Sequence, residues 1–123
     1  MRFSDDILAA VGKSLILGIR AGGGEHKIIG VWAVVVERRV FIRSWGLKPG
    51  GWFATFLKEP RGLMEINGTI LPVRAVRTRS ERLKDAVDEA YAAKYHTKAS
   101  MRWVKDLQRK ASRDSTTELV PVE

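Results

Sequence analysis

Cysteine is absent from this chain of 123 residues, and only two histidines are present. Without cysteine the chain has neither a disulfide framework nor a thiolate metal site. His26 and His96 lie 70 residues apart, and neither has a partner at the spacing of metal ligands or of a catalytic triad. We therefore expect no metal site and no Ser-His-Asp nucleophile.

Long apolar runs are also missing. The longest uncharged apolar stretch, Ile28 to Val36, falls far short of the ~20 residues that a membrane helix needs, and no secretory apolar run follows Met1. A thiol-free chain of this kind suits a reducing compartment, so we expect a cytoplasmic protein without membrane contact. The length predicts one domain over residues 1–123 with a sizeable core.

Acidic residues are fewer than basic ones. The chain has 22 Lys and Arg against 14 Asp and Glu, a formal charge of +8. Most of the excess lies between Arg74 and Arg113, which hold twelve basic residues and five acidic ones. This asymmetry favours an anionic partner, and charge alone does not choose among nucleic acid, a membrane surface and a phosphorylated small molecule.

Several segments have the sequence pattern of β-strands. Residues 32–36 and 40–45 are apolar and β-branched, which is typical of strands covered on both faces, and the polar residues 37–39 between them predict a hairpin with a three-residue loop. Asn67-Gly68 predicts a type I′ hairpin in which Ile66 opposes Thr69. Residues 15–19 predict a first strand, and residues 116–121 predict a sixth strand, at an edge because of Pro121.

Helical patterns surround these strands. A short helix is predicted from Ser4 or Asp5 to near Gly12, and a lid helix over residues 52–58, which Pro60 prevents from continuing. A capping box at residues 78–81 opens a helix that should run to about Tyr95, and a further helical stretch follows it. We therefore predict a mainly β fold of six short strands with helical additions.

Chemistry-bearing residues gather where the second strand of the first hairpin leaves the core. The members are Arg43, Ser44, Trp45, Lys48, Gly51 and Trp52. Cations and backbone N–H groups suit phosphate, and indoles suit a flat ring, so this composition is typical of a site for a small anionic aromatic ligand. The alternative is structural: both indoles lie in the core and the arginine reaches solvent.

Several motifs give the chain a family resemblance. They are W-x-V-V-V at residues 32–36, Arg43-Ser44, the run Gly50-Gly51-Trp52-Phe53, A-Y-x-x-K-Y at residues 90–95, and T-x-x-L-V-P at residues 116–121. With them the chain resembles a bacterial domain-of-unknown-function family, DUF2255. That family is in turn similar to the FMN-binding split barrels, which include pyridoxamine phosphate oxidases and deazaflavin-dependent nitroreductases.

The resemblance implies a six-stranded antiparallel split β-barrel, a homodimer, and FMN or deazaflavin bound near the subunit interface. It implies ligand roles for Arg43, Ser44, Trp45 and Trp52, and more loosely for Lys27. The cofactor would supply the redox chemistry of an oxidoreductase, and the protein would supply position and electrostatics.

Two other functions stay open. One is a nucleic-acid-binding module that uses the basic C-terminal third, with Trp103 or Tyr95 as a stacking surface. The other is an accessory protein with a barrel fold that retains no cofactor, because the glycine-rich phosphate signature of the deazaflavin enzymes is missing from the chain.

Overall fold

The structure is a computed structural model, and it describes residues 2–23 and 26–122. The strands are β1 (Leu17–Ala21), β2 (Ile29–Val31), β3 (Ala33–Val36), β4 (Arg39–Ile42), β5 (Arg61–Ile66), β6 (Thr69–Arg77) and β7 (Thr117–Pro121). The helices are α1 (Asp5–Lys13), α2 (Trp52–Lys58), α3 (Glu81–Lys94), α4 (Lys98–Leu107) and α5 (Lys110–Asp114). Within these ranges no helix combines the length and the apolar character that crossing a bilayer requires.

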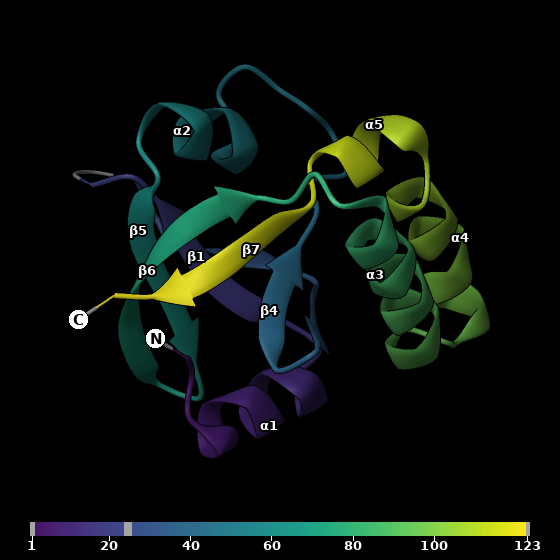
Figure 1. Ribbon diagram of the computed structural model, residues 1–123, viewed down its shortest axis with the longest axis horizontal. Helices are drawn as coiled ribbons and strands as arrows, with labels where there is room; N and C mark the ends of the chain where they lie inside the picture. The colour runs from purple at the N-terminus through teal and green to yellow at the C-terminus, as the bar shows by residue number, and fades with distance from the viewer. Residues whose placement is uncertain (1, 24–25, 123) are drawn as a thin grey trace.

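The strands form one antiparallel sheet in the order β2-β1-β5-β6-β7-β4-β3. The two strands at the ends of this order, β2 and β3, follow each other in the chain with only Trp32 between them. Both edges of the sheet therefore meet at Trp32, and the sheet curls into a nearly closed barrel (Figure 1). The predicted mainly β, antiparallel barrel with helices is confirmed, with seven strands instead of six because β2, a short strand around Gly30, was not predicted.

Both predicted hairpins are present. Asn67 and Gly68 have φ values of 50° and 81°, and Ile66 pairs with Thr69, as their sequence predicts. The first hairpin is tighter than expected, since Val36 pairs with Arg39 and leaves a two-residue turn. Its residues, Glu37 and Arg38, adopt φ values of 54° and 63° although neither is glycine.

The last strand does not lie at an edge. β7 pairs with β6 on one side and with β4 on the other, so the expectation drawn from Pro121 is wrong. Pro121 is the final residue of the strand, where the missing N–H interrupts little of the ladder. The N–H of Val122, one residue further on, donates to the carbonyl of Pro72 at 3.2 Å.

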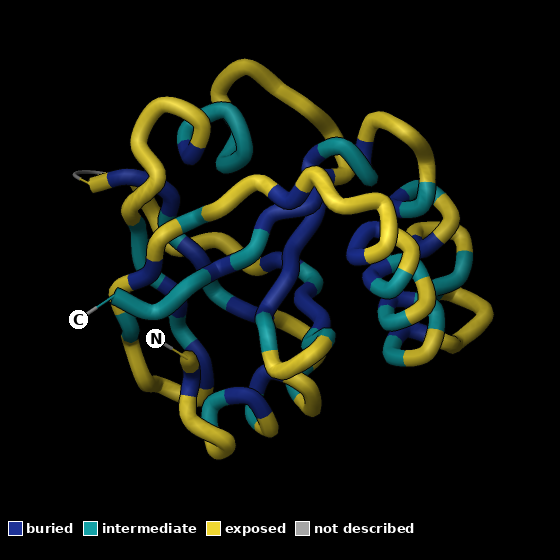
Figure 2. The backbone as a smooth tube through the Cα atoms, viewed as in Figure 1, coloured by how far each residue is buried: buried dark blue, intermediate teal, exposed yellow. Residues whose placement is uncertain are grey.

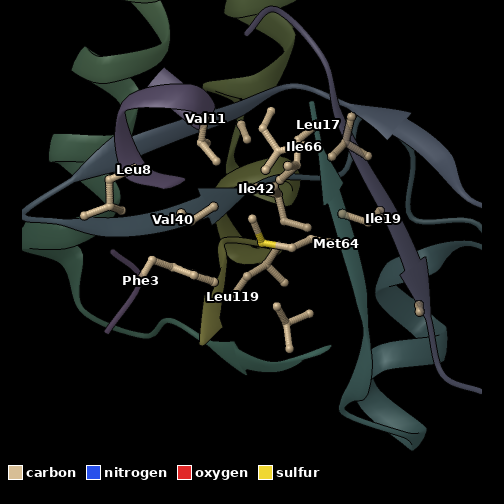
Figure 3. Close-up of a cluster of buried hydrophobic side chains, with 14 of the residues drawn as sticks. Phe3, Leu8, Val11, Leu17, Ile19, Val40, Ile42, Met64, Ile66 and Leu119 are labelled. Carbon is tan, nitrogen blue, oxygen red and sulfur yellow. The ribbon is translucent and has the colours of Figure 1, made fainter. Parts of the chain in front are cut away.

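The barrel interior is the main hydrophobic core (Figure 3). Strand side chains such as Ile19, Ile42 and Met64 fill it, and Leu8 and Val11 of α1 close one end. Ser4 caps α1 as predicted, because its hydroxyl accepts the N–H of Ile7 at 3.3 Å. At the other end lies α2, which buries Phe56 in the same core and so forms the predicted lid (Figure 1).

A second core lies outside the barrel, between the β3–β4 hairpin and helices α3 and α4. Its buried members are Val34, Phe41, Leu83, Val87, Tyr91, Tyr95, Val104 and Leu107. Alternate residues of β3 and β4 thus enter two different cores, which confirms that these strands are covered on both faces. Helix α3 begins after Ser80, whose hydroxyl accepts the N–H of Leu83 at 3.2 Å, and the predicted cap at Thr78 instead donates its N–H to Thr116.

Candidate functional site

The residues predicted to form one site lie in three places. Arg43 and Ser44 are buried, Trp45 faces a hollow with two other tryptophans, and Lys27, Gly51 and Trp52 line a cleft at the lid end of the barrel. Lys48 is exposed in the loop of residues 45–51, which joins the last two places and lies on the surface (Figure 2). Its carbonyl accepts the N–H of Gly51 at 2.9 Å, so it shapes the loop without lining the cleft.

Arg43 is the largest fully buried side chain among the described residues. Its Nε donates to Thr116 Oγ1 at 2.8 Å, one terminal nitrogen donates to the carbonyl of Leu107 at 2.9 Å and to the Asp88 carboxylate, and the other donates to the carbonyl of Lys84 at 2.7 Å. Burial lowers the pKa of Arg43, and the Asp88 carboxylate opposes that shift. The guanidinium thus ties β4 to the helices and does not face a ligand cleft, in contrast to our expectation.

The polar groups of Ser44 also form hydrogen bonds within the protein. Its hydroxyl donates to the carbonyl of Gly46 at 2.6 Å, its N–H donates to Ser115 Oγ at 2.8 Å, and its carbonyl accepts the hydroxyl of Ser112 at 2.8 Å. These bonds fix the point where the chain leaves β4 and enters the loop. Ser44 therefore positions the loop, and the structure does not bring it to the cleft.

The cleft lies between β1, the segment leading into β2, and α2, and it holds about 190 Å³. Its lining residues are Ile19, Ala21, His26, Lys27, Ile29, Gly50, Gly51, Trp52 and Thr55. We call it the Lys27–Trp52 cleft. The nitrogen-bearing side chains of Lys27 and His26 share this lining with the indole of Trp52 and with apolar residues, and none of the described lining residues is acidic. Trp52 is held edge-on by Phe53 and Phe56, with ring centroids 6.0 and 6.1 Å away.

The tryptophan hollow is lined by Trp32, Trp45 and Trp103 and holds about 340 Å³. Trp32 stacks on Tyr95 at 4.0 Å, and Trp45 meets Trp32 edge-on at 4.9 Å. The indole N–H of Trp45 donates to the carbonyl of Trp103 at 3.1 Å, which fixes the ring while leaving it partly exposed. Trp45 thus contacts α4 and does not contact Trp52, although Trp52 is much nearer to it in the sequence.

The side chains of the A-Y-x-x-K-Y stretch at the end of α3 donate to backbone carbonyls of the barrel, of α1 and of the segment between α1 and β1. The hydroxyls of Tyr91 and Tyr95 donate to Trp32 and Leu15 at 2.6 and 2.7 Å, and the ammonium of Lys94 donates to Val11 and Ala33 at 2.9 and 2.6 Å. Burial lowers the pKa of Lys94 to about 8 and raises the pKa of Tyr95 to about 12. These side chains hold α3 against the barrel.

The fold defines a class: an antiparallel, nearly closed barrel with a lid helix and a helical layer on one side. The chain belongs to the family described as "Uncharacterized protein conserved in bacteria (DUF2255)", whose family model matches residues 9–119. A crystal structure of the conserved hypothetical protein Rv2991 from Mycobacterium tuberculosis is similar, with a TM-score of 0.63 and 14% sequence identity over 98% of this chain and 82% of that one. At this identity the similarity concerns the fold alone. No curated protein matches the chain.

Proposed function

We propose that this protein binds a flavin-type nucleotide, FMN or a deazaflavin, in the Lys27–Trp52 cleft. The observation that carries the proposal is the meeting of Lys27, His26 and Trp52 from separate parts of the chain in one cleft. An ammonium and an imidazole suit phosphate oxygens, and an indole suits the face of a flat ring. The absence of side chains at Gly50 and Gly51 leaves room for a ligand to approach the backbone.

The size of the cleft favours a dimeric site. Its 190 Å³ is smaller than the roughly 300–1,000 Å³ of ordinary ligand pockets, so one chain would enclose only part of a nucleotide. Four large apolar side chains in β2 and in the segments leading into β1 and β2 are exposed: Leu15 at 64%, Ile16 at 51%, Ile28 at 41% and Ile29 at 45%. Ile29 itself lines the cleft. We propose that a second copy covers this face and completes the site.

The roles of the side chains follow from their chemistry. Lys27 and His26 would hold the phosphate, Trp52 would lie against the ring system, and Ile19 with Ile29 would exclude water from it. When bound, the flavin would supply the electron-transfer chemistry of an oxidoreductase. Arg43, Ser44 and Trp45 have no part in this arrangement, since their polar groups are engaged elsewhere.

The proposal is tested by titrating the purified protein with FMN and with a deazaflavin nucleotide while following the fluorescence of the ligand. Lys27→Ala should weaken binding about 10- to 100-fold, because one charge-assisted hydrogen bond is removed. Lys58→Ala is the matched control, since it removes an equal charge at the far end of α2. Sedimentation of the same samples should show dimers that Ile28→Glu separates, with Ile70→Glu as control, because Ile70 on β6 is also exposed, at 53% against 41% for Ile28.

Two results would overturn the proposal. One is the absence of binding at about 100 μM ligand, far weaker than a resident cofactor requires. The other is an equal loss of affinity in Lys27→Ala and Lys58→Ala, which would assign the effect to general charge. Either result would favour the alternative function, an accessory protein with a barrel fold that retains no cofactor.

A further inference from the structure

Helix α4 carries three exposed basic residues on one face, and a fourth follows its end. Lys98, Arg102 and Lys105 recur at intervals of four and three residues, which places them along one side of the helix. Arg109, also exposed, lies two residues past Leu107, in the extended backbone between α4 and α5. We call these four residues the α4 basic stripe. Asp106 is the single acidic residue between Lys98 and Arg109, and it lies 3.4 Å from Arg109 at the surface. The stripe therefore has a net positive charge.

The stripe borders the tryptophan hollow. Trp103 projects from α4 next to Arg102, whose guanidinium lies 5.1 Å from the centroid of the Trp103 ring. Trp45 and Trp103 are 41% and 44% exposed, and their centroids are 6.3 Å apart. A second hollow of about 440 Å³ continues from these two rings toward Arg109 and Ser112. Flat rings and cations thus share one surface.

We propose that the α4 basic stripe and the tryptophan hollow bind single-stranded nucleic acid without sequence preference. The stripe contacts successive phosphates, and an unstacked base stacks on the exposed indole of Trp103, which Trp45 supports edge-on. This combination of a positive track with aromatic platforms is the general physical basis of single-strand binding. The site is separate from the Lys27–Trp52 cleft and does not depend on the cofactor.

The burial of α4 argues against an anionic membrane as the partner. A helix that binds a lipid surface inserts its apolar face between the headgroups. In α4 that face carries Val104 and Leu107, which are fully buried in the second core. Only the charged face and Trp103 are left for a partner, which suits an extended polyanion with flat rings.

The test is fluorescence anisotropy with a fluorescein-labelled oligo(dT) of about 12 nucleotides, a length within the usual range of single-strand sites, at several salt concentrations. The stripe variant replaces Lys98, Arg102, Lys105 and Arg109 by glutamine. The control variant replaces four exposed basic residues on other parts of the chain, Arg2, Lys58, Arg61 and Arg74, and reaches the same net charge. The stripe variant should show a salt slope shallower by about 0.7 for each phosphate that the protein no longer neutralises, and the control variant should keep the wild-type slope.

Trp103→Ala tests the stacking of a base on the indole. It should weaken binding about 5- to 150-fold at fixed salt, the effect of removing one stacked base, while Trp103→Phe keeps most of the affinity. Circular dichroism of each variant establishes that it is folded. The proposal is overturned by equal reductions of affinity in the stripe and control variants, by unchanged affinity in Trp103→Ala, or by binding to phosphatidylserine vesicles in place of the oligonucleotide.

Discussion

Replacing Arg43 by methionine tests whether this residue is structural, as its contacts indicate. Methionine keeps much of the length and the apolar stem of arginine and removes the guanidinium. The substitution takes donors away from Thr116, from the carboxylate of Asp88, and from the carbonyls of Lys84 and Leu107. All of these groups lie between β4 and the helices, and none of them lines the Lys27–Trp52 cleft.

The magnitude follows from these hydrogen bonds. Removing one partner of a buried ion pair typically costs about 3–5 kcal/mol. Asp88 would keep Arg113 as a second ion-pair partner, which reduces that penalty. The two carbonyls lose a buried donor, and each unsatisfied group costs about 1–3 kcal/mol unless water reaches it. We therefore expect Arg43→Met to lower the free energy of unfolding by about 3–4 kcal/mol.

Urea unfolding followed by circular dichroism measures this change. The midpoint should fall while the slope with denaturant stays constant, because the surface exposed on unfolding is nearly the same. Arg82→Met is the matched control: Arg82 also forms an ion pair, with Glu37, but its side chain is 66% exposed, and its midpoint should change little. A cost below about 1 kcal/mol for Arg43→Met, together with loss of nucleotide binding, would refute the structural role.

Two further predictions concern the barrel. In urea titrations, Gly62→Ala should lower the free energy of unfolding by at least about 2 kcal/mol, because the added Cβ would lie 2.2 Å from the carbonyl oxygen of Arg20. The control is Gly12→Ala in helix α1, where an added Cβ meets nothing within 4 Å, and it should raise the free energy of unfolding by about 0.5–1 kcal/mol. Burial lowers the pKa of Lys94 from 10.5 to about 8, so between these values the unfolded chain binds more protons and stability rises with pH. Above pH 10 the raised pKa of Tyr95, about 12, acts in the opposite direction, because the folded state then holds the extra proton. Thermal unfolding at pH 7 to 11 should show the rise from pH 8 to 10 in wild type and lose it in Lys94→Met; an equal rise in both refutes the assignment.

The elements that the sequence predicts well are those with a local cause. The Asn67-Gly68 turn dictates its own backbone geometry, and that geometry sets the pairing of the strands on either side. The apolar run of β3 likewise reveals burial on both faces, since no polar residue interrupts it. Helix α2 begins at Trp52 and is limited by Pro60, both of which are visible in the sequence.

The parts that sequence reasoning missed have distant causes. Arg43 comes directly after β4, and side chains alternate between the two faces of a strand, so Arg43 lies on the same face as Phe41. The helices that cover this face begin about 40 residues later in the sequence. That alternation is a usable signal, because the apolar pattern of this strand predicts that the face of Phe41 is covered. The position of β7 between β6 and β4 depends on how the ends of the sheet meet, which no local pattern encodes.

The residues behind the family resemblance therefore divide by physical role. Tyr91 and Lys94 donate to barrel carbonyls, Tyr95 donates to the carbonyl of Leu15 just before β1, and Arg43 donates to the helices. Polar side chains thus hold the helical layer and the barrel together. Because Tyr91 bonds the carbonyl of Trp32, this hydrogen bond also fixes the break between β2 and β3 where the barrel closes. Such residues specify the fold whatever the ligand, so under both proposals the selectivity for a ligand would depend on the exposed groups at the Lys27–Trp52 cleft and on α4.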